Sequence, residues 1–122
     1  AFQNRDVRVA LAKAVDWAEI NKKLYYDTRT VATSFGPPSV PGGGTDICGA
    51  DCTYDAAAAK SMLEAAGGLP GNKVQVAGLA NSPNEAPKAE CNMIQKNLGV
   101  ECTVRVFVVR RHARRVQRAG RR

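Results

Sequence analysis

The stretch that decides the fold is KVQVAGLANSPNEAPKAECNMIQKNLGVECTVRVFVV, residues 73–109. Residues 73–80 begin with alternating valines, a pattern that predicts a strand. A helix is predicted to follow, because Pro87 suits a first helical turn and Gly99 suits a helix end. Residues 100–109 again read as a strand. A strand, a helix and a second strand within about 35 residues form a βαβ unit, so the two strands are predicted to be parallel.

The same stretch carries two cysteines, and the distance of each from Gly99, measured along the helix or the strand, can be compared. Cys91 precedes Gly99 by eight residues, or about 12 Å along a helix. Cys102 follows Gly99 by three residues, or about 10 Å along a strand. Because the strand runs back beside the helix, the two sulfurs are predicted to lie nearly level. A disulfide would then join the helix to the second strand.

The other two cysteines are Cys48 and Cys52, in the sequence ICGADC. A disulfide between them would close a tight bend. A zinc site is a weaker reading, since zinc ligands are usually paired more closely than Cys91 and Cys102, and the single histidine, His112, lies far along the chain. No metal or cofactor is therefore expected. Disulfides are typical of an oxidising, extracytoplasmic compartment.

Two short helices are predicted in the first 26 residues. Asn4 or Asp6 can cap the first helix. Its apolar residues recur at helical spacing: Val7, Leu11, Ala14 and Val15. Arg8, adjacent to the buried face of this helix, is expected to form an ion pair with Asp16 or Asp6. Asp16 and Glu19 form a D-x-x-E pattern related to a capping box, so a second helix is predicted to run to about Leu24.

A long loop and a third helix are predicted next. Residues 27–52 are rich in Thr, Ser, Pro and Gly and include Pro37-Pro38 and Gly42-Gly43-Gly44, so no regular element is expected there. A loop of this length is uncommon in a compact domain and usually has a function. Asp55 then precedes the helix-forming sequence AAAAKSMLEAAGG.

The net positive charge of the chain is concentrated at its C-terminal end. Its 122 residues include 18 Lys and Arg, seven of which are Arg in residues 110–122, while the remaining 11 balance the 11 Asp and Glu. We therefore divide the chain into a neutral body, residues 1–109, and an Arg-rich tail. Candidates for polyanion binding in the tail are Arg110, Arg111, Arg114, Arg115 and Arg118. Nucleic-acid binding is disfavoured, because no aromatic platform or basic stripe extends the tail into the body.

The sequence indicates neither a membrane-spanning protein nor an enzyme. No stretch reaches the roughly 18 apolar residues of a membrane helix. The first residues, AFQNRDVRV, do not resemble a signal peptide, so for an exported protein we expect that the signal has already been removed or lies on a longer precursor. No nucleophile, base and orienting group can be assembled, and no phosphate loop is present. We expect the protein not to be an enzyme.

Four blocks together resemble the family 5 extracellular solute-binding proteins, which bind oligopeptides, dipeptides or nickel for ABC importers. VRVALAKAVDWAEINKKLYY (7–26) resembles the family signature V-R-x-A-L-x-x-A-(I/V)-D-(R/W). TRTVATSFGPPSVPG (28–42) is similar to its Pro-Pro loop. CTYDAAAAKSMLEAAGG (52–68) is similar to Y-D-P-x-x-A-K-x-L-L-x-E-A-G, with Ala56 in place of Pro, and IQKNLGVECTVRV (94–106) resembles its helix-to-strand segment.

The resemblance implies a fold and a function. The fold is α/β: a small part of the second lobe, with a βαβ unit, N-terminal helices, a long Pro/Gly loop and two disulfides. The function is binding of short peptides outside the cell, as a segment or truncated form of a protein that serves an ABC permease. Candidate ligand-binding residues in the cleft-facing loop are Thr33, Ser34, Phe35 and Pro37.

Two alternatives stay open, because family members are several times longer than this chain. One is a secreted interaction or inhibitor module derived from such a lobe, and the other is polyanion binding through the tail. A lobe removed from a larger sheet also exposes strand edges, so a homodimer is a further expectation.

Overall fold

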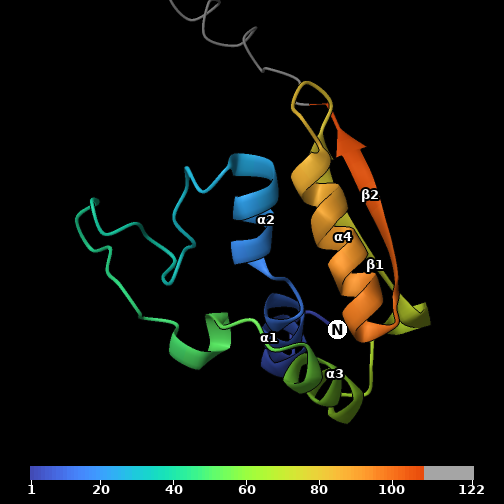
Figure 1. Cartoon of the computed structure of the whole chain (residues 1–122). Coiled ribbons are helices and arrows are strands. Elements are labelled where there is room, and N and C mark those ends of the chain that lie inside the picture. The colour runs from blue at the N-terminus through green and yellow to red at the C-terminus, as the bar shows by residue number, and fades with distance from the viewer. Residues whose placement is uncertain (109–122) are drawn as a thin grey trace, which may run out of the picture.

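The computed structural model describes residues 1–108. Its helices are α1 (Arg5–Lys13), α2 (Trp17–Tyr25), α3 (Ala56–Ala65) and α4 (Glu85–Leu98), its strands are β1 (Lys73–Leu79) and β2 (Glu101–Phe107), and single 3-10 turns cover Gly49–Cys52 and Pro70–Asn72. The fold is mixed α/β, as predicted (Figure 1).

The βαβ unit is confirmed. β1 and β2 are parallel neighbours, with a register that runs from Lys73 opposite Glu101 to Leu79 opposite Phe107. Alternate residues of the two strands differ in burial: Val74 and Val76 are covered, whereas Gln75 and Ala77 are exposed. One face of this small sheet therefore packs on α4, and the other faces solvent.

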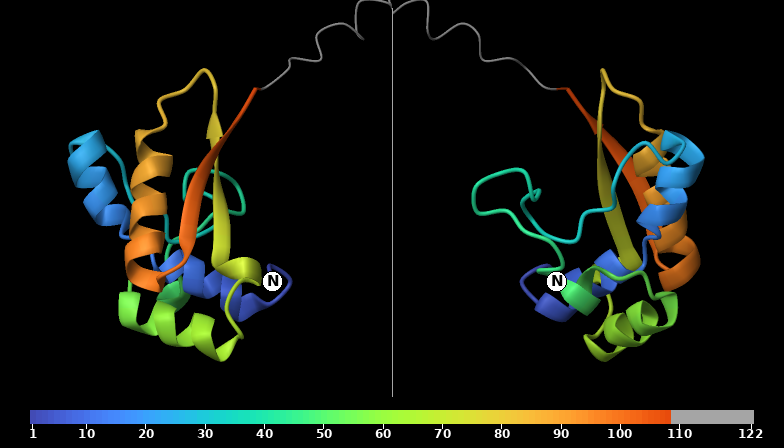
Figure 2. Two further views of the ribbon diagram at one scale, coloured as in Figure 1. Left: turned by 90° about the vertical axis from the view of Figure 1, so that its right-hand side faces the viewer. Right: turned by 60° about the vertical axis from the view of Figure 1, so that its left-hand side comes forward.

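The helices form further layers around this unit. α4 lies between the sheet and α2, while α1 and α3 pack against each other at one end of the strands (Figures 1 and 2). The loop between α2 and α3 extends to the side of this body. The buried core contains residues from every layer: Val7, Ala10, Ala14, Val15, Ile20, Ala59, Leu63, Leu69, Val74, Ile94, Leu98 and Val100.

The predicted helix starts are those of the structure. The side chain of Asn4 accepts a hydrogen bond from the backbone N–H of Asp6 (2.9 Å). Asp16 caps α2 through the N–H of Glu19 (3.0 Å), and Asp55 caps α3 in the same way. These side chains satisfy N–H groups that have no partner within the helix, which is why Asn and Asp are favoured at such positions.

Both disulfides are present. Cys91 on α4 and Cys102 on β2 are joined by a disulfide, with their Cα atoms 5.4 Å apart. The prediction that the two residues lie level and form a disulfide is therefore confirmed. Cys48 and Cys52 are joined across the Gly49–Cys52 turn, with Cα atoms 5.6 Å apart. Because all four thiols are used in disulfides, the zinc reading is wrong for these cysteines.

Three details differ from the sequence prediction. The long loop is not wholly irregular, since its last residues form the 3-10 turn Gly49–Cys52. β2 begins at Glu101 and ends at Phe107, inside the predicted range 100–109. An ion pair of Arg8 with an aspartate, suggested by its neighbours in sequence, is also wrong. Its guanidinium donates instead to the carbonyl oxygens of Phe2 (2.7 Å) and Gln3 (3.0 Å), which the preceding turn brings within reach.

Candidate functional site

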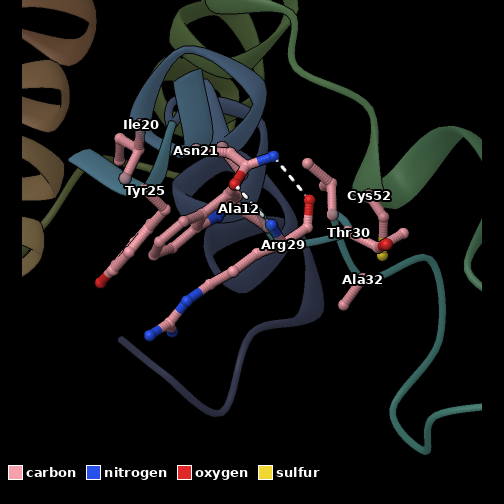
Figure 3. Close-up of a pocket in the computed structure, with 10 residues that line it drawn as sticks. Ala12, Ile20, Asn21, Tyr25, Arg29, Thr30, Ala32 and Cys52 are labelled. Atoms are coloured by element: carbon pink, nitrogen blue, oxygen red, sulfur yellow. Dashed lines mark hydrogen bonds between the residues drawn. The ribbon is translucent and has the colours of Figure 1, made fainter. Parts of the chain in front are cut away.

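A hollow of about 390 Å³ lies between α2 and the chain that follows it, and we call it the α2 pocket. Its lining residues are Ala12, Trp17, Ile20, Asn21, Tyr25, Arg29, Thr30, Val31, Ala32 and Cys52 (Figure 3). Its surface is mainly apolar. A small, largely apolar pocket with few polar groups is the usual form of a ligand site.

α2 supplies four of the ten residues that line the pocket. Trp17, Asn21 and Tyr25 are four residues apart and therefore lie on the same side of a helix, one turn above another. Ile20, which is 2% exposed, joins this face to the core. Trp17 is 41% exposed and lines both this pocket and a second hollow next to it.

The chain reverses at the end of α2 and so builds the facing wall. Tyr26 and Asp27 both have left-handed backbone conformations, with φ of 52° and 57°. The N–H of Asp27 donates to the carbonyl of Asn21 (3.2 Å), and the N–H of Thr28 donates to that of Tyr25 (2.9 Å). These bonds use the free carbonyl groups of the helix end and return residues 29–32 alongside α2.

Asn21 holds the returning segment in place. Its amide Nδ2 donates to the backbone carbonyl of Arg29 (2.6 Å), and its Oδ1 accepts from the backbone N–H of Arg29 (3.2 Å) (Figure 3). One side chain thus pairs with both backbone groups of a single residue, as a neighbouring strand would. Asn21 is a structural part of the pocket, with each of its two polar atoms already bonded.

Among residues 1–108, Arg29 is the single charged residue that lines the pocket. Its guanidinium carbon lies 3.8 Å from the centre of the Tyr25 ring, and Figure 3 shows the two side chains side by side. This is a cation–π contact, in which the ring stabilises the positive charge. The pocket therefore combines an apolar interior with one oriented cation.

The last wall comes from the end of the long loop. The Cys48–Cys52 disulfide stiffens the Gly49–Cys52 turn, and Cys52 borders the pocket. The turn is attached to α1 by an ion pair between Arg5 and Asp51 and by a hydrogen bond from the Lys13 ammonium to the carbonyl of Ala50. This attachment brings Cys52 next to residues 30–32, some 20 positions earlier in the chain.

The predicted ligand residues follow Ala32 of the pocket along the chain but do not line the pocket. Thr33 and Ser34 use their hydroxyl groups inside the loop: Thr33 Oγ1 accepts from the N–H of Asp46 (3.0 Å), and Ser34 Oγ donates to the carbonyl of Gly44 (2.6 Å). Phe35 is fully exposed. Pro37 is also exposed, and its carbonyl accepts from the N–H of Val40. Their role in ligand binding stays a prediction.

The predicted polyanion residues lie outside the described residues. Arg110, Arg111, Arg114, Arg115 and Arg118 all belong to residues 109–122, as does His112. Within residues 1–108, no helix has the length and apolar character needed to cross a membrane. Over the same part of the chain, no three His, Cys, Asp or Glu side chains are grouped so as to hold a metal ion.

A second hollow, of about 450 Å³, adjoins the first and shares Ala12 and Trp17 with it. It borders the free edge of β1. The backbone N–H and C=O of Leu79 are bonded to the side chain of Asn84, so these backbone groups point away from β2. The backbone groups of Gln75 and Ala77 point to the same edge, because the direction alternates from one strand residue to the next. The other wall includes Glu90 and Ile94 of α4.

Burial raises the pKa of the Glu90 carboxyl. A raised pKa in the folded state means that the folded chain binds more protons than the unfolded chain between the two pKa values, so stability decreases as the pH rises through the folded pKa. We expect Glu90→Gln to raise the melting temperature at pH 7 and to flatten its dependence on pH in this range. Thermal melts from pH 4 to pH 8 measure both effects.

Glu19→Gln is the control for this prediction. Lys23 lowers the pKa of Glu19 through a hydrogen bond and its positive charge, so this carboxyl stabilises the fold above its unfolded pKa. The control variant should therefore not gain stability at pH 7. A decrease in the melting temperature of Glu90→Gln at pH 7 would contradict the expected sign.

The α2 pocket was not predicted from the sequence, although part of its signal is there. Trp17, Asn21 and Tyr25 are spaced for one helix face, and two aromatic residues around an amide are unusual on an exposed surface. The contribution of Arg29 and Cys52 has no such signal, because Arg29 reaches the pocket through the reversal at the end of α2 and Cys52 through the disulfide-closed turn attached to α1.

Comparison with known proteins gives a consistent result. The family model described as bacterial extracellular solute-binding proteins, family 5 Middle, matches residues 1–110. A solved structure of the periplasmic murein tripeptide-binding protein MppA, in its unliganded open form, is similar with a TM-score of 0.65 and 25% identity over 87% of this chain. Oligopeptide-binding protein 2 of clavulanic acid biosynthesis is similar with a TM-score of 0.60 and 25% identity over 88%. No curated protein matches the sequence.

The chain is much shorter than these two proteins. The matched region covers 22% of the MppA chain and 20% of the clavulanic acid protein. The similarity therefore extends over nearly all of this sequence but only about a fifth of each of the others.

Proposed function

The chain belongs to the bacterial extracellular solute-binding proteins of family 5, and we propose that it takes part in binding short peptides for uptake by an ABC importer. The observation that carries this proposal is the similarity to two structures described as binding a tripeptide or oligopeptides. The α2 pocket supports it, since a mainly apolar hollow with one cation suits part of a peptide.

Because the chain matches only about a fifth of each of the two solved structures, we expect it to supply only part of a peptide site. In this proposal it is part of one lobe, and the remainder of the peptide site and the surface that meets the permease belong to other parts of a longer protein. A segment with half of a cleft binds with lower affinity than the whole, because fewer contacts offset the loss of ligand freedom. We therefore expect dissociation constants for this chain in the millimolar to high micromolar range, on the order of those of small fragments.

The two disulfides support a location outside the cytoplasm. Disulfides persist in oxidising compartments such as the periplasm and the cell surface. Cys48–Cys52 and Cys91–Cys102 account for every cysteine of the chain, so a reducing compartment would remove both cross-links.

Peptide binding predicts a rise in melting temperature. A ligand that binds the folded chain alone and is present at ten times its dissociation constant stabilises by about 1.4 kcal/mol. For a domain of this size the melting temperature should increase by about 5 °C. The measurement is a set of thermal melts with millimolar tripeptides and tetrapeptides, followed by calorimetric titration of the best one.

The control for this experiment is an equimolar mixture of the constituent amino acids, which has the same composition but no peptide backbone. It should produce little or no increase. An unchanged melting temperature with every peptide at millimolar concentration, together with no calorimetric heat of binding, would reject the proposed function for this chain.

A further inference from the structure

The second hollow borders an edge of β1 that has no partner strand among residues 1–108, and we propose that this edge pairs with the same edge of a second copy of the chain. The two β1 strands run antiparallel about a two-fold axis, so the two-stranded sheets of the two copies become one continuous sheet. This inference goes beyond the proposed function and does not depend on it. It is carried by the free backbone groups of β1, by the order of its residues and by the charges at its ends.

The free edge of β1 carries backbone groups of Gln75 and Ala77 that β2 does not use. β2 pairs with the opposite edge, and among the described residues no strand lies beside this one (Figure 2). Within residues 1–108, no hydrogen bond outside the β1–β2 ladder uses the N–H or C=O of Gln75 or Ala77. A row of such groups is a template for pairing with a strand of another chain.

Asn84 limits this free edge at the C-terminal end of β1. Its side chain bonds the N–H and the C=O of Leu79, each at 3.1 Å, and so takes the place of a neighbouring strand at this residue. An incoming strand therefore meets only the part of the edge that precedes Leu79. A short edge of this kind favours weak and reversible association.

An antiparallel pair centred on Val76 fits this short edge. Val76 then lies opposite Val76 of the second copy, and Gln75 lies opposite Ala77, so each Gln75–Ala77 pair exchanges two backbone hydrogen bonds. Leu79, whose backbone groups are already bonded, falls opposite Lys73 at the end of the strand. The side chains are compatible as well, since valine meets valine in the closely spaced pair and the small Ala77 meets the longer Gln75.

The charges at the ends of β1 favour this arrangement. Lys73 is the single charge of β1, and the two copies of Lys73 lie about 20 Å apart, at opposite ends of the pair. Each one comes close to the second copy's Asn84 and to Glu85, the next residue and the first of α4. Glu85 is exposed and makes no ion pair within residues 1–108. The pair of Lys73 with Glu101 (3.3 Å) is exposed and contributes little, so Lys73 is available to Glu85.

The second hollow adds apolar surface next to the edge. Val76 and Ala77 belong to its lining together with Phe2 and Trp17, which are 57% and 41% exposed. A strand laid along β1 borders the same hollow, so it removes part of this apolar surface from water. This contribution adds to the backbone hydrogen bonds and favours association of the two copies.

The test measures the mass of the full 122-residue chain in solution. Sedimentation equilibrium from micromolar to millimolar concentration should show a reversible increase from the 13.0 kDa of one chain toward twice that mass. Gln75→Pro removes an N–H that points away from β2, and proline is tolerated at such an edge position. It should weaken the association about tenfold or more, because each dimer loses two backbone hydrogen bonds.

Val106→Pro is the matched control at the other edge of the sheet. The carbonyl of Phe107 accepts from the N–H of Ala80 on the β1 side, so the backbone groups of Val106 point to the outer edge of β2. This variant should associate as the unmodified chain does. Circular dichroism and a thermal melt establish that both proline variants are folded.

A charge exchange tests the same contact without proline. Lys73→Glu and Glu85→Lys each bring like charges together between the copies and should weaken the dimer about fivefold. The double variant restores opposite charges and should recover most of the association. This recovery is not expected if each residue acts only within its own chain.

The outcomes that contradict the proposal are specific. A full chain that stays monomeric at millimolar concentration overturns it. Association that Gln75→Pro leaves unchanged, or that Val106→Pro weakens equally, also overturns it, because the contact then lies away from the β1 edge. A double charge variant that recovers nothing overturns the register centred on Val76. None of these results concerns peptide binding, so they are distinct from a failure of the proposed function.

Discussion

Replacing Cys91 and Cys102 together with Ala should lower the free energy of unfolding by about 3 kcal/mol. The disulfide closes a loop of about a dozen residues, and the cross-link removes conformational freedom from the unfolded chain by roughly this amount. It also fastens α4 to β2 at a buried position, since Cys91 is 5% exposed. Urea denaturation without reducing agent measures the difference, because the midpoint shifts in proportion to stability.

The matched control is the double replacement Cys48→Ala and Cys52→Ala. This disulfide closes a loop of about five residues, so its effect on the unfolded chain is smaller, at about 2 kcal/mol. It lies in the loop and holds no layer of the core. A loss below about 1 kcal/mol for the Cys91 and Cys102 pair would mean that packing of α4 on the sheet is sufficient without the cross-link.

Replacing Leu63 with Ala should lower the free energy of unfolding by about 3 kcal/mol, within the range found for buried leucines. Leu63 is 4% exposed and belongs to α3, the helix that packs against both α1 and α4. Ala fills less of this space, so apolar contacts are lost and a cavity remains. A fall in the melting temperature of about 10 °C is expected for a domain of this size.

Glu64→Ala on the same helix tests whether the effect comes from burial. Glu64 is exposed and makes no ion pair within residues 1–108, so its replacement should change stability by less than about 0.5 kcal/mol. Equal losses for the two variants would contradict the assignment to burial, since Ala is the strongest helix former and neither replacement lowers helix propensity.

The elements of the fold were predictable because each has a local cause. Asn4, Asp16 and Asp55 satisfy the first N–H groups of their helices, and these caps depend on residues only two or three positions away. The disulfide of Cys91 and Cys102 was predictable for a similar reason. Fixed rises per residue in helix and strand place both residues at one height once the βαβ order is known.

Contacts between distant parts of the chain were less predictable. Arg8 has aspartates nearby in sequence, yet it donates to the carbonyl groups of Phe2 and Gln3, because the turn before α1 directs these groups toward it. Thr33 and Ser34 were selected as residues of a cleft-facing loop, but their hydroxyl groups are bonded within the loop itself. Sequence patterns identify donors and acceptors and leave open which of several partners they meet.

The sequence by itself determined the secondary structure, the βαβ order, both disulfides and the resemblance to the family, because these depend on short-range spacing. Only the tertiary structure decided where a ligand could bind. The α2 pocket requires two successive left-handed residues, Tyr26 and Asp27, to return Arg29 to α2, and it requires the attached turn to bring in Cys52. Neither residue is a glycine, and although Asp is enriched at such positions, Tyr26 has no marker in the sequence, so the pair depends on the hydrogen bonds and packing of the folded chain.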